Sequence, residues 1–460
     1  MPVSTHIRRG RRAARIGFAA VLSLFLLTAP AVQSQEAAAP AAPGQTLTLT
    51  EALRRAIEAN LATRRARSQT AVAEAQVRQL RSSILPQVEL NGSATRNSDE
   101  VSFETEGFTA TILPENDWRY DVTLRQPIYA GGRELKALRQ GRLNVDATRQ
   151  GVRQSEDLAL LGTAADYLAL VQGDELLEVE RRNLELAQRR RTQSQAFYEA
   201  GEVTRVDVLR AETDMKAVER AIAVAEQNRG QAASRLRETL ALDVTPGTGI
   251  AVQNPNLEFP PLPPAEELIA QAEANRPEVR QAELAAEISR LEVSKQRAAR
   301  LPVVRGEASW ISQRANFPAD QYGAFTINLN LPIWDSGLVA SRVATAREQE
   351  TQAKLTLEER KRAVREDVLQ ALLDLETADK ALALAREQLS AAEAEYNQSF
   401  ELYRAQEATS LDLQSAESSL AEARRAVVTD SLSRDLAEIN VWSAVGILKN
   451  TILSEEVEQP

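Results

Sequence analysis

The residues Gln126-Pro127-Ile128-Tyr129-Ala130-Gly131-Gly132 are echoed 205 residues later by Leu331-Pro332-Ile333-Trp334-Asp335-Ser336-Gly337. Further echoes lie on both sides of this motif: Glu58-Ala59-Asn60 with Glu273-Ala274-Asn275, Leu85-Pro86 with Leu301-Pro302, and Tyr198, Asp207, Ala211 and Glu212 with Tyr403, Asp412, Ala416 and Glu417. The offset stays between 205 and 216 residues, which chance would not maintain along a whole chain. The sequence is therefore an internal duplication.

Segments that alternate apolar and polar residues flank the motif in both copies. They cover about residues 87–97 and 118–129, and again 303–312 and 322–333. A period of two predicts strands with one apolar and one wet face. The apolar positions beside the motif are Trp118, Tyr120, Val122 and Leu124 in the first copy, and Phe325, Ile327, Leu329 and Leu331 in the second. Strands of about ten residues with aromatic ends are typical of outer-membrane proteins, so these side chains are predicted to face lipid. The alternative is a soluble hairpin packed on a core.

A long proline-free segment follows each hairpin, at about 133–198 and 338–403. As helices these segments would be roughly 100 Å long. In the second copy, large residues recur every seven positions at Val368, Leu375, Leu382, Leu389, Tyr396 and Tyr403, with Ala371, Ala378, Ala385 and Ala392 three residues after the first four. This pattern predicts a close, left-handed coiled-coil seam. The first copy keeps Leu170, Leu177, Leu184 and Tyr198 but breaks the pattern at Arg191.

The remaining sequence gives the domain organisation. Arg8, Arg9, Arg11, Arg12 and Arg15 precede a short apolar run, so residues 1–34 are predicted to be a secretory signal, removed from the mature chain. The other predicted segments are a flexible leader at 35–46, a first repeat at 47–242, a proline-rich linker at 243–264, a second repeat at 265–450 and a disordered tail at 451–460. Within the first repeat we expect one helix from about 50 to 85 and an acidic loop over about 98–117.

Composition argues against an enzyme. The chain has no Cys, and its one His, His6, lies in the predicted signal. The mature chain would therefore have no thiol nucleophile, imidazole base, or nitrogen or sulfur metal ligand, so we expect no catalytic residue, metal or cofactor. Loss of five signal-segment arginines takes the formal charge from −10 to −15, which disfavours nucleic acid as a partner.

The strand count requires other copies of the chain. Four strands cannot close a barrel, because small membrane barrels need about eight. An open sheet edge cannot sit in lipid, since its backbone groups would lack partners. Two copies would supply eight strands and three would supply twelve, and twelve strands leave room for a channel.

The duplicated helix–hairpin–helix–helix pattern resembles the TolC-like outer-membrane efflux proteins. The resemblance rests on Leu-Pro before each hairpin, on the motifs at 126–132 and 331–337, and on Ala-Gly-Glu-Val-Thr-Arg-Val-Asp-Val-Leu at 200–209, and it covers about 47–450. It implies a mostly α-helical homotrimer with a twelve-stranded barrel in the outer membrane of a Gram-negative bacterium, continuous with a helical tunnel in the periplasm. It also implies docking to a periplasmic adaptor and an inner-membrane pump of RND, ABC or MFS type.

The resemblance also implies a gate at the helix ends. Asp207 matches the acidic gate residue, Tyr403 matches its tyrosine partner, and Asp412 matches an aspartate whose three copies ring the constriction. Ala408 and Ser415 depart from members with an arginine lock and a second aspartate ring, which would weaken both features. For Asp207 and Asp412, plain helix capping is the alternative. The predicted adaptor-docking turns are Ala200, Gly201 and Glu202, and Ala405, Gln406 and Glu407.

Two functions follow from these features. The first is an outer-membrane exit duct for small molecules or secreted proteins, and the second is a periplasmic coiled-coil adaptor. An adaptor would lack two hairpins with apolar outer faces. The sequence leaves the cargo and the pump class open.

Overall fold

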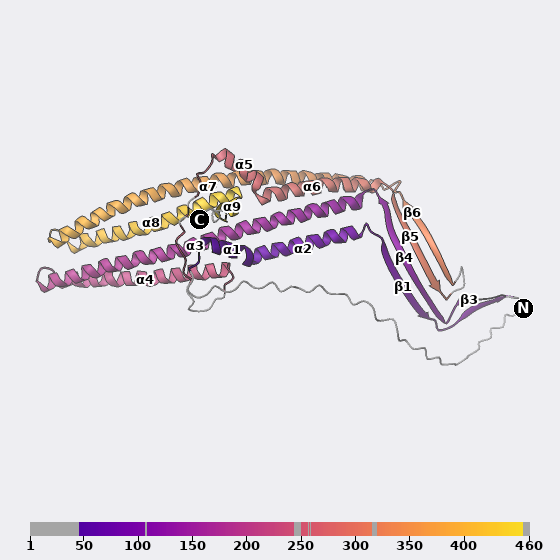
Figure 1. The fold of residues 1–460 in the computed structure, drawn as a ribbon, viewed down its shortest axis with the longest axis horizontal. Helices are drawn as coiled ribbons and strands as arrows, with labels where there is room; N and C mark the ends of the chain where they lie inside the picture. The colour runs from indigo at the N-terminus through magenta and orange to yellow at the C-terminus, as the bar shows by residue number, and fades with distance from the viewer. Residues whose placement is uncertain are drawn as a thin grey trace, which may run out of the picture. The chain divides into compact units, whose positions relative to one another are not determined.

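The computed structural model describes residues 46–105, 108–242, 250–255, 257, 259–314 and 320–453. Backbone contacts divide the chain into Met1–Ala42 and Pro43–Pro460, and every described residue belongs to the second unit. The predicted signal segment lies outside the described residues. Long helices and a sheet make up the described part of the chain (Figure 1). None of the described helices is long and apolar enough to cross a membrane.

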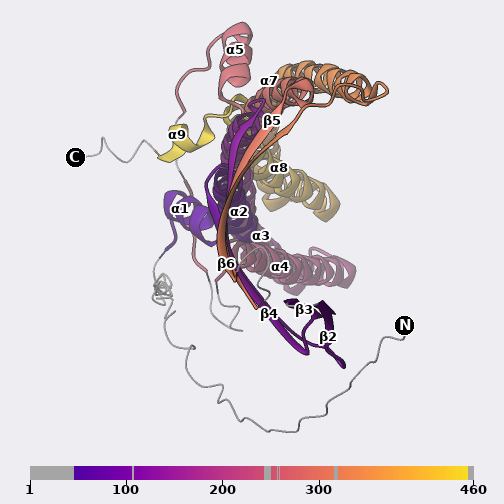
Figure 2. The ribbon, with the colours of Figure 1, turned by 90° about the vertical axis from the view of Figure 1, so that its right-hand side faces the viewer.

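One antiparallel sheet contains strands from both repeats. Its order is β1 (Gln87–Arg96), β4 (Asn116–Ala130), β5 (Val303–Gln313) and β6 (Gln321–Asn330). The β4–β5 pairing joins the hairpin of the first repeat to that of the second, and β1 and β6 form the two edges. The sheet follows the ends of the long helices (Figure 1), and its strands are curved (Figure 2).

The loop predicted at 98–117 is wrong. Two further strands, β2 (Val101–Thr105) and β3 (Phe108–Leu113), pair as a separate hairpin in this segment. The acidic residues and Gly107 suggested a loop, but the segment after Gly107 is rich in threonine and large apolar residues, which favour strands.

The single helix predicted for about 50–85 is also wrong. Asn60 has an extended ψ of 123°, so α1 (Leu49–Ala59) ends there and α2 (Leu61–Ser82) begins. The Asn60 side chain accepts hydrogen bonds from the backbone N–H groups of Ala62 and Thr63, at 2.8 and 3.2 Å. An asparagine that caps the next helix therefore divides a segment whose composition is otherwise helical.

The long helices α3 (Arg133–Glu199) and α7 (Leu338–Arg404) each have 67 residues, which corresponds to about 100 Å. Each starts directly after a glycine in the left-handed region, Gly132 at φ 73° and Gly337 at φ 84°. Asp335 also accepts hydrogen bonds from the N–H groups of Gly337 and Val339. The echoed motif is thus the strand-to-helix turn in both repeats.

The shorter helices α4 (Arg205–Thr239) and α8 (Ser410–Val445) return along α3 and α7 (Figure 1). The second repeat begins with α5 (Ala265–Asn275), α6 (Pro277–Arg297) and the short 3-10 helix η1 (Ala298–Arg300). The last helix is α9 (Leu448–Leu453), so the first three residues of the predicted disordered tail are helical. The rest of that tail lies outside the described residues.

The core lies where the repeats meet. Tyr167 is fully buried, and its hydroxyl is 2.8 Å from the carbonyl oxygen of Leu47 and 2.6 Å from that of Gln253. The heptad seam predicted in α7 is confirmed at Val368, Leu375, Leu382 and Tyr403, which are all buried. Packing along this seam holds together the helices that extend away from this core.

Candidate functional site

Two tight turns end the helical hairpins, and the same capping arrangement follows each turn. The Asp207 carboxylate accepts hydrogen bonds from the N–H and hydroxyl of Thr204, at 3.1 and 2.7 Å. The Asp412 carboxylate does the same with Thr409, at 2.9 and 2.6 Å. These hydrogen bonds hold the pKa of Asp412 below its ordinary value. Both aspartates therefore take part in helix capping, as the alternative interpretation predicted: each is the third residue of its helix and completes a capping box with the N-cap threonine.

The turn residues Ala200, Gly201, Glu202, Ala405, Gln406 and Glu407 are all exposed. Gly201 and Gln406 occupy equivalent positions and both adopt the left-handed conformation, with φ of 76° and 64°. The Gln406 side chain donates a hydrogen bond to the Glu202 carboxylate, so the turns of the two repeats touch within one chain.

Tyr403 is buried at the end of α7. Its hydroxyl lies 3.1 Å from the Ser194 hydroxyl on α3, and its ring meets the edge of Phe197 with a centroid distance of 5.7 Å. The resemblance pairs Tyr403 with Asp207, but in this chain each has another partner, since Asp207 bonds Thr204. Tyr403 therefore fixes the end of α7 to α3.

A buried charge cluster, which the sequence analysis missed, lies deeper between the hairpins. Arg190 on α3 is 3% exposed, with Nη2 at 2.5 Å from Asp214 Oδ2 on α4 and Nη1 at 3.2 Å from Glu417 Oε2 on α8. Burial raises the pKa of Glu417 to about 7; Arg190 opposes this shift and Asp214 adds to it. In the sequence, the heptad pattern of the first repeat breaks at Arg191. In the structure, the buried residue is its neighbour Arg190.

The other predicted gate position is Ser415, and it is exposed, as is Asp412. Ala408, in the position of the arginine lock, is half-buried. A single chain does not bring symmetry-related copies of these residues together.

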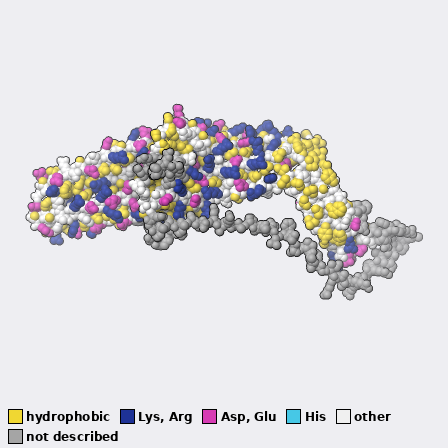
Figure 3. All heavy atoms as spheres, in the orientation of Figure 1, with side chains coloured by type: hydrophobic (Ala, Val, Ile, Leu, Met, Phe, Trp, Pro, Cys, Tyr) yellow, Lys and Arg dark blue, Asp and Glu magenta, His cyan; other side chains and the backbone are white. Residues whose placement is uncertain are grey.

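The second functional surface is the sheet. Figure 3 shows hydrophobic side chains gathered over it, in contrast to the mixed charges on the helices. The eight predicted lipid-facing side chains are between 37% and 71% exposed: Trp118, Tyr120, Val122, Leu124, Phe325, Ile327, Leu329 and Leu331. An apolar face of this extent marks a surface made for a partner or a membrane.

The opposite face of the sheet is polar and internally bonded. Arg125 lies 2.5 Å from Glu89 and 3.6 Å from Glu307, so charges join three neighbouring strands. Asn91 donates a hydrogen bond to Asp121 at 3.0 Å. The sheet thus has its charged residues on one face and its apolar residues on the other.

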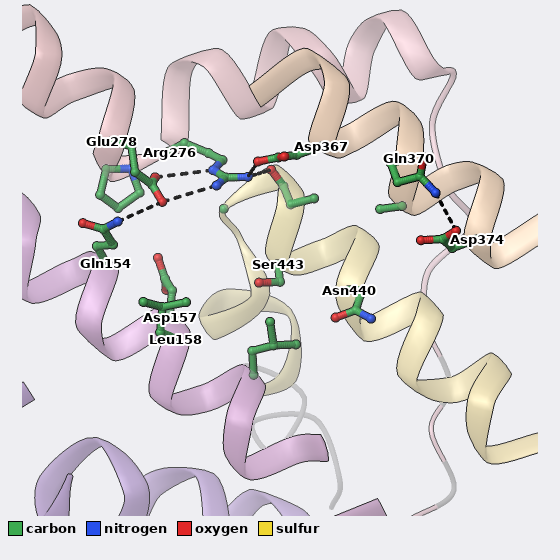
Figure 4. A pocket seen from close by; sticks show the side chains of 15 residues that line it. Gln154, Asp157, Leu158, Arg276, Glu278, Asp367, Gln370, Asp374, Asn440 and Ser443 are labelled. Atoms are coloured by element: carbon green, nitrogen blue, oxygen red, sulfur yellow. Dashed lines mark hydrogen bonds and ion pairs between the residues drawn. The ribbon is translucent and has the colours of Figure 1, made fainter. Parts of the chain in front are cut away.

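A cavity of about 310 Å³ lies among α3, α6, α7 and α8 (Figure 4). Arg276 crosses it, at 3.3 Å from Glu278 and 3.0 Å from Asp367. Burial, Glu278 and Glu156 raise the pKa of Asp157 on its wall to about 6. Arg276 is already paired with carboxylates on α6 and α7. These ion pairs therefore connect the two helices across the cavity.

Comparison with known proteins agrees with this geometry. The family described as Outer membrane efflux protein matches residues 52–242 and 268–447, which lie in the two repeats. The chain belongs to this family. It is 23% identical over 356 residues to the outer membrane efflux protein BepC of Brucella suis, a match that covers 75% of this chain and 76% of BepC.

Solved structures show the same fold. The chain superposes on CusC with a TM-score of 0.76 at 18% identity, over 86% of this chain and 92% of CusC. It superposes on the open state of the MtrE outer membrane channel of Neisseria gonorrhoeae with a TM-score of 0.71 at 20% identity, over 87% and 89% of the two chains. Membership of the family identifies the chain as an outer-membrane exit duct of an efflux system, and not as an adaptor.

Proposed function

We propose that three copies of the chain form one duct, with twelve strands in the outer membrane and a helical tunnel below them. The observation that carries this proposal is the sheet β1-β4-β5-β6, which combines an exposed apolar face with two edge strands. Lipid favours the apolar face but would leave the edge backbone groups without partners, so β6 of one copy would pair with β1 of the next. Three copies would give the twelve strands a channel needs.

The gate of this duct lies at the helix ends. Asp412 and Ser415, exposed in one chain, would face the tunnel axis, where three Asp412 carboxylates would attract cations and repel anions. Asp207 and Tyr403 would hold the closed arrangement, and Ala408 would leave it without an arginine lock. Helix capping can coexist with this role, because it holds the carboxylates of Asp207 and Asp412 at the helix starts.

The exposed turns would dock a periplasmic adaptor, which would connect the duct to an inner-membrane pump of RND, ABC or MFS type. Their small residues, Ala200, Gly201 and Ala405, leave the turn backbone open to a partner. We propose no catalytic activity, since the mature chain would have neither Cys nor His.

Planar-bilayer recording of the purified mature protein tests the duct directly. We expect discrete single-channel current steps that favour cations. The Asn328→Arg protein, altered on the polar face of β6, should still insert and conduct. Insertion of the unaltered protein without current steps would contradict the proposed function.

A further inference from the structure

A second echo lies where each repeat enters the sheet. Arg81 stands four residues before Leu85, and 216 residues later Arg297 stands four residues before Leu301. The two leucines are 49% and 42% exposed, and both arginines are exposed as well. In each repeat, an exposed leucine therefore lies next to the sheet, and an arginine lies about one turn farther from it.

The start of α3 shows the same order of side chains. Leu135 is 64% exposed, and Arg139 lies one turn farther from the sheet on the same side of the helix. At three places along the junction of sheet and helices, an apolar side chain is thus followed by a guanidinium. This is the order expected where the hydrocarbon of a membrane gives way to its headgroups, because long basic side chains extend to the polar layer.

Arginines on three neighbouring helices lie at one level. Gly141 on α3 packs so closely on α2 that a Cβ atom there would lie 2.7 Å from Leu80 Cδ1, which brings Arg142 level with the end of α2. On the other side of α3, Arg139 pairs with Glu287 of α6 at 2.9 Å. Arg142 lies nine residues from the start of α3, or about 14 Å. We call the exposed arginines within this distance of the sheet the basic band: Arg78, Arg81, Arg139, Arg142, Arg290 and Arg297.

The basic band differs from the rest of the chain, which is acidic overall. α2 carries five arginines against one glutamate, and residues 133–153 of α3 carry six basic residues against two acidic ones. Farther from the sheet the balance reverses, since residues 366–404 of α7 carry nine acidic and three basic residues. Figure 3 shows Lys and Arg concentrated on the helices beside the sheet, on the face that also carries the hydrophobic side chains of the sheet. Positive charge is therefore gathered next to the apolar surface.

Most of the basic band has no acidic partner. Within the described residues, four of its six members make no ion pair: Arg78, Arg81, Arg142 and Arg297. The acids nearest to them on α2 and α3, Glu74 and Asp146, both pair with Arg149 instead, at 3.0 and 3.3 Å. An exposed guanidinium without an internal partner can donate all its N–H groups to an anion, and its planar fork suits two oxygens of a phosphate.

We propose that the basic band binds the phosphate groups of anionic phospholipids in the periplasmic leaflet of the outer membrane, and so fixes the depth of the sheet in the bilayer. The proposal rests on the duct proposed above, in which lipid covers the apolar face of the sheet and the helices continue into the periplasm. The level of the band agrees with this partner, because headgroups occupy roughly 5–8 Å beyond the hydrocarbon and basic side chains extend toward them.

The cell wall is another anionic partner in the periplasm. Its carboxylates would meet a basic surface at any height along the helices, so they do not explain why the arginines lie at the sheet. They also do not explain the exposed leucines beside those arginines. The leucine–arginine order therefore favours lipid over the cell wall.

Lipid preference can be measured on the purified mature trimer. Its melting temperature is recorded in neutral-detergent micelles with increasing phosphatidylglycerol, and again with zwitterionic phosphatidylcholine, and the half-saturating concentrations are compared. We expect a preference for phosphatidylglycerol that weakens at about 0.5 M salt, because exposed charges are screened. Arg78→Gln, Arg81→Gln and Arg142→Gln together should lower this preference by roughly tenfold or more, since each basic residue near an anionic surface contributes to the attraction.

The matched control removes three exposed arginines that lie far from the sheet, by Arg191→Gln, Arg220→Gln and Arg235→Gln. It makes the same charge change and should leave the lipid preference unaltered. If the band variant does not assemble, Arg81→Gln alone decides the question, with an expected fall in preference of roughly fivefold.

Three results would overturn this inference. They are an unaltered trimer that prefers neither lipid, an equal loss of preference in the band variant and the control, and a band variant that keeps its lipid preference but no longer co-sediments with isolated cell wall. Absence of a trimer from the unaltered protein would contradict the proposed duct, whereas a conducting trimer without lipid preference would contradict only the role of the basic band. The two failures are therefore distinguishable.

Discussion

The sheet and the helical seam of this chain use apolar side chains in opposite ways. On β6, Phe325 and Leu329 are 71% and 68% exposed, whereas Val368 on α7 is fully buried. Polar residues are exposed in both regions, since Arg125 and Glu89 pair on the polar face of the sheet, and Arg386 and Glu387 lie on the exposed surface of α7. The chain thus exposes apolar side chains on the sheet, where lipid would cover them, and buries them between the helices. Substitutions in either region should reveal this difference.

The largest effect should come from a charge on the apolar face of the sheet. Leu329→Arg would place a cation in lipid, at a cost of about 2–4 kcal/mol per copy near the midplane, paid three times in a trimer. We expect loss of the assembled protein from outer-membrane fractions, measured by immunoblot. Asn328→Arg is the neighbouring control and should assemble. Thr123 is an unsuitable control despite its place on the polar face, because it is only 3% exposed.

The next effect should come from the buried charge cluster. Arg190→Gln would leave Asp214 and Glu417 without their cation, and the loss of a buried partner costs about 3–5 kcal/mol. Proton uptake by Glu417, whose pKa is already raised to about 7, would reduce this cost to the lower end. We expect the melting temperature in detergent to fall by roughly 3–5 °C.

Lys216→Gln provides the control for that substitution. Lys216 forms an exposed ion pair with Glu219 on the same helix, and such pairs contribute little. An equal fall in melting temperature for both variants would show that the buried cluster contributes no more to stability than an exposed ion pair does.

A smaller effect is expected at the helix start that carries Asp412. Asp412→Ala should weaken cation selectivity and block by multivalent cations, because it removes three carboxylates from the tunnel neck. The trimer should persist, since loss of a favourable helix-start charge costs about 0.3–1 kcal/mol. Reversal potentials under a salt gradient measure the selectivity, and unchanged values would mean that Asp412 is only a helix cap.

The smallest effect should appear at the polar cavity as a dependence on pH. The pKa of Asp157 is raised to about 6, so the folded chain keeps this proton at pH values where the unfolded chain has lost it. Its contribution to stability is therefore present at pH 4 and lost as the pH rises through 6. Asp157→Asn cannot ionise, and should melt roughly 1–3 °C higher than the unaltered protein at pH 7.5 but equally at pH 4. A constant difference at both pH values would contradict this account.

The features that repeat with a fixed period were predictable from the sequence. The strands of the sheet and the α7 seam follow from periods of two and seven. The capping interactions of Asp207 and Asp412 could be predicted because both residues stand at a helix start directly after a turn. The break at Asn60 was not predictable in this way, because one side chain that bonds the next helix overrides helical composition.

Contacts between distant segments were also beyond the sequence analysis. Arg190, Asp214 and Glu417 lie on three different helices, and no local pattern brings them together. Glu417 was visible only as the echo of Glu212, and the two have different surroundings, since Glu417 is nearly buried and Glu212 is exposed. The duplication therefore predicts which residues occupy equivalent positions, but not which residues each of them contacts.

In the proposed trimer, the chain completes its sheet with two further copies of itself. Native mass spectrometry of the protein extracted from outer membranes in mild detergent measures this directly. We expect a complex of three mature chains. A single mature chain that keeps its folded sheet under these conditions would contradict the proposed trimer.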